Sequence, residues 1–222
     1  MTSYKLGLNR IASPGMKLEN YIAFASDNGF EAVELRNDLG DGEITDGMSA
    51  EAVRDLSIKY GVKIAAINAL QRFNDREETL PARTAELRQL LKIAKAAGIE
   101  AVVLCPVNDK PEPRSEQERM EDTVRALKTY GSLFKEYGIF GYIEPLGFVQ
   151  CSLRFKKQAV EAIEKSGFAE CYKLVHDTFH HYLAEETELY PEYTGIVHMS
   201  GVLPGKDLEV ITDADRILVT DK

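Results

Sequence analysis

Apolar and polar positions alternate along this chain in a pattern that recurs through most of its length. In each copy of the pattern an amphipathic stretch ends near a glycine, and a short apolar run follows. The clearest copies are centred on Gly29, Gly61, Gly98 and Gly138. A helix often ends at a glycine because the residue after it favours positive φ. Helices that alternate with short apolar runs indicate βαβ units and a parallel sheet.

The amphipathic stretches have helical spacing. Between residues 84 and 97, one face is apolar and the opposite face is basic and polar, as expected for a helix that covers a sheet. That apolar face consists of Leu87, Leu90, Leu91 and Ala94. Comparable faces predict further helices before Gly138 and before Gly167.

The apolar runs, together with an opening strand, predict seven strands. They lie at about residues 5–9, 31–36, 62–68, 101–105, 140–144, 173–177 and 195–199. Seven parallel strands at this spacing favour an α/β fold of the (β/α)8 TIM-barrel type over a doubly wound sheet. No composition shift or low-complexity linker divides residues 1–222, which predicts a single domain.

The pattern lacks an eighth βα unit. After residues 195–199 come a Gly/Pro loop, an acidic segment and the apolar run 217–219, which is too short and too early for the eighth strand. A complete barrel usually takes about 250 residues. We therefore expect a barrel that is incomplete at its C-terminal end, either because the natural chain continues or because a partner closes it.

Composition narrows the classes of partner. The net charge of −9 and a pI near 5.1 disfavour nucleic acid and anionic membranes. The N-terminus lacks a secretory signal pattern, and no apolar run approaches the ~18 residues that a membrane span needs. The three cysteines form no Cys-x-x-Cys pair, so we expect reduced thiols and a cytoplasmic location.

Three of the apolar runs end with a side chain that binds metals. Glu144, Asp177 and His198 follow one another at roughly one strand-plus-helix unit. Since the strands of a parallel barrel end at one rim, these side chains are predicted to meet there. One imidazole and two carboxylates suit a single divalent cation such as Zn, Mn, Co or Mg.

Several of the candidate site residues, and others near them, also have simpler structural interpretations. Asp177 is a candidate N-cap for the segment that follows it, and His198 a candidate core histidine. Glu34 either lines the pocket or pairs with Arg36. Arg216 is as consistent with a surface ion pair as with a substrate contact. His176 precedes Asp177, so strand alternation points it outward.

Several segments resemble a known family, the xylose-isomerase-like TIM barrels of sugar isomerases and epimerases. Within that family the chain is most similar to the inosose isomerases of inositol catabolism. The resemblance covers essentially the whole chain and is carried by residues 67–74, 150–152, 177–180 and 212–216. The Asp-x-x-His element of the third segment, together with the Glu and His strand ends, is its most specific part.

The resemblance implies a site. The family binds one divalent metal through Glu, Asp, His and a second Glu on strands five to eight. Glu144, Asp177 and His198 match the first three ligands, and the fourth belongs to the strand that this sequence lacks. The resemblance also makes Glu144 a catalytic acid/base, and we expect His180 to contact a substrate oxygen as its catalytic companion. Asn68, Arg216 and Glu34 complete the expected substrate-binding set.

We therefore expect a metal-dependent isomerase of a polyol ketone such as 2-keto-myo-inositol, acting through an enediolate. A ketose 3-epimerase, a hydroxypyruvate isomerase, and an inosose or dehydroshikimate dehydratase are alternatives on the same scaffold. A trinuclear zinc endonuclease needs more than the four histidines here and a basic groove. An inactive barrel or binding protein is an alternative of a different class. Relatives often form homodimers or homotetramers, so the expected partners are a small polyol substrate and copies of the chain, with no nucleic acid and no membrane.

Overall fold

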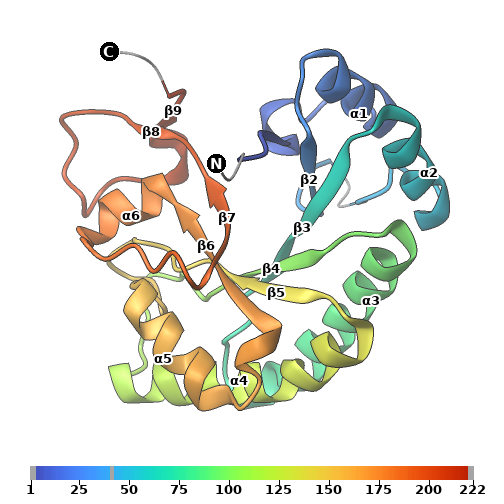
Figure 1. Cartoon of the computed structure of the whole chain (residues 1–222). Helices are drawn as coiled ribbons and strands as arrows, with labels where there is room; N and C mark the ends of the chain where they lie inside the picture. The colour runs from blue at the N-terminus through green and yellow to red at the C-terminus, as the bar shows by residue number, and fades with distance from the viewer. Residues whose placement is uncertain (1–3, 41–42, 220–222) are drawn as a thin grey trace.

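The computed structural model describes residues 4–40 and 43–219. Its centre is a curved sheet of seven parallel strands in the order β1 to β7 (Figure 1). The strands are β1 (Gly7–Asn9), β2 (Ala32–Arg36), β3 (Lys63–Gln71), β4 (Ala101–Cys105), β5 (Phe140–Ile143), β6 (Tyr172–Asp177) and β7 (Thr194–His198). The outer ends of the predicted domain, residues 1–3 and 220–222, lie outside the described residues.

One α-helix connects each of the first six strands to the next strand, and these helices cover the outside of the curved sheet (Figure 1). They are α1 (Leu18–Asp27), α2 (Ala50–Tyr60), α3 (Leu80–Ala97), α4 (Glu116–Tyr137), α5 (Lys156–Ser166) and α6 (Thr178–Ala184). The helices predicted before Gly98, Gly138 and Gly167 are all present. Gly61, Gly98 and Gly138 each terminate a helix with φ between 66° and 72°.

The strand alternation that the sequence predicts sets the two faces of the sheet. Val102 and Leu104 of β4 pack against the helices in the main core, whereas Val103 and Cys105 point into the barrel. The inward cluster consists mostly of small or medium side chains, including Ala66 and Ala101, together with Tyr142. Polar side chains at the last inward position of each strand are therefore brought to a common rim.

Most ends of the seven predicted strands lie within one or two residues of the observed ends. The exception is β3, which runs on to Gln71 because its pairing with β4 resumes after a bulge, at Leu70 with Leu104. The TIM-barrel fold class is confirmed, with seven barrel strands among the described residues.

The segment after β7 forms no eighth barrel strand in the described part of the chain. Instead β8 (Gly201–Val202) and β9 (Arg216–Ile217) pair antiparallel in a separate small sheet beside β7 and α6 (Figure 1). This confirms that residues 217–219 do not complete the barrel. β1 and β7 are consequently the edge strands of the large sheet.

Among residues 4–40 and 43–219, every helix is too short or too polar to cross a membrane. The three cysteines, Cys105, Cys151 and Cys171, are buried and unpaired by disulfides.

Candidate metal centre

The three predicted ligands meet at the carboxyl rim of the barrel. Asp177 and His198 are the last residues of β6 and β7 and are register partners. Glu144 follows β5 directly, and its backbone N–H continues the pairing by donating to Leu104 O at 3.1 Å. One ligand atom from each of the three side chains lies within 4.8 Å of the others. Residues far apart in sequence thus form one compact group of two carboxylates and an imidazole.

Asp177 has two roles at once. It is the N-cap of α6, since its Oδ1 accepts a hydrogen bond from Phe179 N at 2.7 Å. Arg216 Nη1 donates to both of its oxygens, to Oδ2 at 2.9 Å and to Oδ1 at 3.2 Å. The capping interpretation of Asp177 is therefore correct, and it fixes the carboxylate in an orientation that leaves the second oxygen toward the site.

His198 lies between two acidic side chains. Its Nε2 is 2.6 Å from Glu34 Oε2, and its Nδ1 is 3.1 Å from Glu144 Oε1. Burial alone would lower the pKa of His198, but the two neighbouring carboxylates raise it well above its ordinary value of 6.5. The imidazole is therefore an ionic link between β2 and β5 rather than an isolated core histidine.

Glu144 is buried, with 5% of its surface exposed. Burial would raise its pKa, but the charge of His198 and the hydrogen bond from it lower the pKa to about 2. Its other oxygen, Oε2, accepts from the thiol of Cys105 at 3.6 Å. Burial raises the pKa of Cys105 well above its usual value, so the thiol keeps its proton and acts as a donor. Glu144 is thus an ionised carboxylate at neutral pH.

Arg216 links Asp177 to His180. Its Nη1 contacts Asp177, and its Nη2 lies 2.9 Å from His180 Nε2. The guanidinium also stacks over the ring of Phe179 at 4.1 Å. Burial lowers the pKa of His180, so this ring accepts from Arg216 as a neutral imidazole. Arg216 thus forms the ion pairs that one interpretation expects, with Asp177 and with Asp213, and these pairs hold it beside the candidate ligands. Its contact with substrate stays a prediction.

Glu34 and Asn68 also reach the rim, from β2 and β3. Asn68 Nδ2 donates to Glu34 Oε1 at 2.8 Å, and Asn9 Nδ2 of β1 donates to the same oxygen at 3.1 Å. Glu34 does not pair with Arg36, which instead contacts Asp38 through Nε at 2.7 Å. The residues predicted for the site therefore form two hydrogen-bonded groups, one around His198 and one around Arg216, which meet where Glu144, Asp177 and His198 lie within 4.8 Å of one another.

Sequence reasoning left three residues of this region out of the site. Asn9 and Cys105 end β1 and β4; the strand-end rule that found Glu144 applies to both, but Cys105 was interpreted only as a strand terminus. Gly147 was not detectable in this way. A Cβ on it would lie 2.1 Å from the carbonyl oxygen of His180, so its importance depends on how closely the loop after β5 approaches α6. The same loop is tied to α6 by Arg154, which donates to Gly147 O and Leu183 O.

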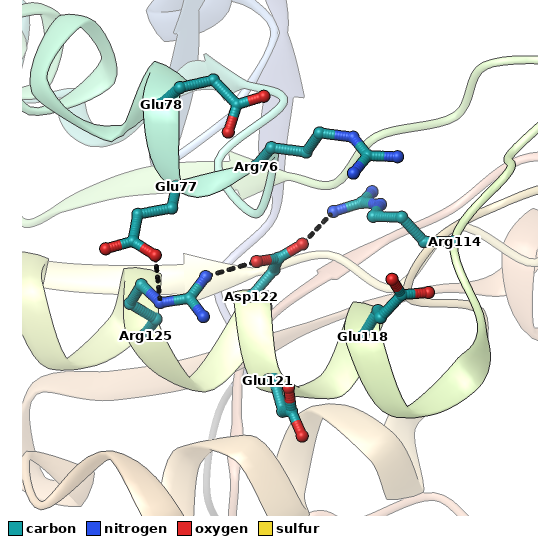
Figure 2. A pocket seen from close by; sticks show the side chains of 8 residues that line it. All are labelled: Arg76, Glu77, Glu78, Arg114, Glu118, Glu121, Asp122 and Arg125. Atoms are coloured by element: carbon teal, nitrogen blue, oxygen red, sulfur yellow. Dashed lines mark hydrogen bonds and ion pairs between the residues drawn. The ribbon is translucent and has the colours of Figure 1, made fainter.

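A polar hollow of about 210 Å³ lies between the short helix at Glu77–Thr79 and the start of α4 (Figure 2). Its charged groups largely neutralise one another. Arg114 bridges Glu112 and Asp122, while Arg125 contacts Asp122 and Glu77. None of the predicted site residues lines it. We therefore treat it as an ion-pair network that joins η2 (Glu77–Thr79) to α4.

The fold and this rim define the class of protein. The chain belongs to the xylose isomerase-like TIM barrel family, whose model matches residues 22–216. The resemblance drawn from the sequence is thereby confirmed.

Individual relatives agree with the family. An inosose isomerase from Halalkalibacterium halodurans is 28% identical over 72% of this chain and 56% of its own length, so the match spans little more than half of that relative. A xylose isomerase domain containing protein from Salmonella typhimurium LT2 is 35% identical, with a TM-score of 0.87 over 98% of this chain and 78% of that one. The IolI protein, solved with a zinc atom, has a TM-score of 0.85 at 22% identity, over 96% of this chain and 78% of its own.

Proposed function

We propose that this chain is a divalent-metal-dependent isomerase or epimerase of a polyol ketone, with 2-keto-myo-inositol as the leading substrate. The observation that carries the proposal is the convergence of Glu144, Asp177 and His198 within 4.8 Å at the barrel rim. The name of the Halalkalibacterium relative, an inosose isomerase, supports the choice of substrate. The net charge of −9 fits a small substrate better than nucleic acid.

The donor set fits a divalent cation. Two buried carboxylates and one imidazole would hold it, and they match the mixed N/O preference of Zn, Mn or Co, with Mg favoured less by the imidazole. A bound cation would supply Lewis-acid stabilisation of the negative charge that develops on two neighbouring substrate oxygens. The zinc atom of the IolI structure is consistent with this assignment.

The protein's own side chains would transfer the proton and bind the substrate. Glu144 is ionised, as a general base must be, and it is the carboxylate that would remove a proton from the carbon next to the carbonyl and return it to the adjacent carbon. His180 and Arg216 are suited to hydrogen-bond the oxygens of the enediolate and to hold the substrate in register. Asn68 is suited to bind a ring hydroxyl near β3.

Related activities need the same chemistry at the same rim. A ketose 3-epimerase, a hydroxypyruvate isomerase or a dehydratase of inosose or dehydroshikimate would also begin with proton removal beside a carbonyl. The alternative from a different class is an inactive barrel that binds a ligand without turnover. Proton exchange with solvent separates the two classes.

The test is an NMR assay of the metal-loaded protein with inosose in deuterated buffer. We expect deuterium to appear at the carbon next to the carbonyl. We expect Glu144→Gln to slow this exchange by about 100-fold or more, the usual contribution of a general acid/base. Glu170→Gln is the matched control, because Glu170 is exposed and pairs only with Lys135 on the surface. Exchange at the unaltered rate in Glu144→Gln would remove Glu144 from its role, and no exchange in the unaltered protein would favour the inactive barrel.

A further inference from the structure

We propose that Glu34 is a positioning residue for His198, which it holds so that Nδ1, and not Nε2, is the nitrogen offered to the divalent cation. The inference rests on the proposed metal site and assigns a role to a residue outside the ligand set. It replaces the expectation that Glu34 contacts the substrate.

The two ring nitrogens of His198 face different neighbours. Nδ1 faces Glu144, which is itself a candidate ligand, at 3.1 Å. Nε2 faces Glu34 on the opposite side of the ring at 2.6 Å. Glu34 is not one of the three side chains that converge on the candidate metal position. Only Nδ1 therefore points toward the group of oxygens that would share a cation.

Glu34 is buried and held by hydrogen bonds. It has 4% of its surface exposed. Its Oε1 accepts from Asn68 at 2.8 Å and from Asn9 at 3.1 Å, which leaves Oε2 for His198. Because the two amides come from the neighbouring strands β1 and β3, they fix the carboxylate from both sides. Both oxygens therefore accept from protein donors, and the carboxylate is held in the orientation that a positioning residue needs.

A carboxylate in this position has a known physical effect. A histidine that binds a metal through one nitrogen commonly donates its other N–H to a carboxylate, and this bond fixes the tautomer and makes the ring a stronger ligand. Loss of such a partner typically lowers metal affinity by about 10- to 100-fold. Glu34 would act in this way from β2, although it lies 164 residues from His198 in the sequence.

The direct test is ¹⁵N NMR of the histidine rings in the unaltered protein, with and without Zn²⁺. We expect Zn²⁺ to shift Nδ1 of His198 and to leave a proton on Nε2. Binding through Nε2 would overturn the inference while keeping the metal site. If the protein binds no Zn²⁺ at all, the proposed function fails, which is a separate result.

Variants give a second readout. Glu34→Ala should weaken Zn²⁺ binding by about 10- to 100-fold, and Glu34→Gln should fall between it and the unaltered protein, since its amide oxygen still accepts from Nε2–H. The matched control is Glu161→Gln, an exposed partner of Lys165, which should bind as before. Because Glu34→Ala exposes a buried polar cluster and risks misfolding, the conclusion depends on the affinity of folded Glu34→Gln. Unchanged affinity in that variant, together with metallation at Nε2, would contradict the proposal.

Discussion

At the scale of single residues, His198 is the ionic centre of the rim. It lies between Glu34 and Glu144, and their charges outweigh the burial that opposes ionisation. Each carboxylate would be costly to bury without this partner. The same arrangement that neutralises two buried acids thus keeps the imidazole of a candidate metal ligand in place.

The raised pKa of His198 predicts how cation binding depends on pH. A proton must leave the imidazole before it can bind a metal. Because the folded pKa lies well above 6.5, the proton still competes at neutral pH, and the apparent affinity should rise as pH rises toward that pKa. We expect an increase of up to about tenfold per pH unit for one displaced proton. Titration calorimetry with Mn²⁺ between pH 6 and 8, in two buffers of different ionisation enthalpy, measures both the affinity and the released proton. An affinity that stays constant over this range, with no proton released, would contradict the assignment.

At the scale of elements, the site depends on the contact between the loop after β5 and α6. α6 has only seven residues, so its position is set by neighbours more than by its own hydrogen bonds. Asp177 caps its start, and Arg154 ties its end to the loop. His180 and Phe179 are positioned by this helix, which places Arg216 as well.

The close approach at Gly147 gives a prediction for this contact. In Gly147→Ala the new Cβ would lie 2.1 Å from His180 O and 2.8 Å from Ala184 N. These are backbone atoms, so either the helix or the loop after β5 must shift. We expect a loss of about 1–3 kcal/mol in the free energy of unfolding and a fall in turnover as His180 moves. Chemical denaturation and the exchange assay measure the two effects.

Gly15→Ala is the control for this substitution, because a Cβ on Gly15 would contact nothing within 4 Å. It should change stability and turnover little. Equal behaviour of Gly147→Ala and Gly15→Ala would show that α6 is not held in the way described.

At the scale of the whole molecule, the seven-stranded sheet is strongest at its centre. β4 is buried along its whole length and pairs with β3 and β5. β7 pairs with β6 alone among the described strands, and Val197 on its outer face is 51% exposed. Edge strands have fewer hydrogen bonds and contacts to lose on local opening.

Hydrogen exchange measures this gradient. We expect the amides of β1 and β7 to exchange faster than those of β4 in the metal-free protein, and those near His198 to slow when Mn²⁺ is added. Protection of β7 equal to that of β4 would mean that the seam between β7 and β1 is covered in solution.

Most of this fold could be predicted from the sequence because each βα unit carries its own signal. The glycine that ends a helix and the apolar run after it are local, and they located the strands to within a few residues. The extension of β3 to Gln71 was missed, because it depends on a bulge in the pairing with β4.

The site was predictable where side chains follow strand ends. Glu144, Asp177 and His198 were brought together as expected. The partner of Glu34 was not predictable, because Arg36 lies nearby in sequence whereas His198 is 164 residues away. The contact arises only when β2 and β7 face each other across the barrel. The requirement for glycine at residue 147 was not predictable for the same reason, since the close contact comes from the backbone of another element.

The most direct test of the central claim is the metal content of the purified chain. After incubation with excess Mn²⁺ or Zn²⁺ and removal of the free ion, elemental analysis should find one divalent ion per chain. The variant in which Glu144, Asp177 and His198 are replaced by Gln, Asn and Gln should remain folded by circular dichroism and retain almost none. An equal ion content in the two proteins would contradict the proposal that these three side chains hold the cation.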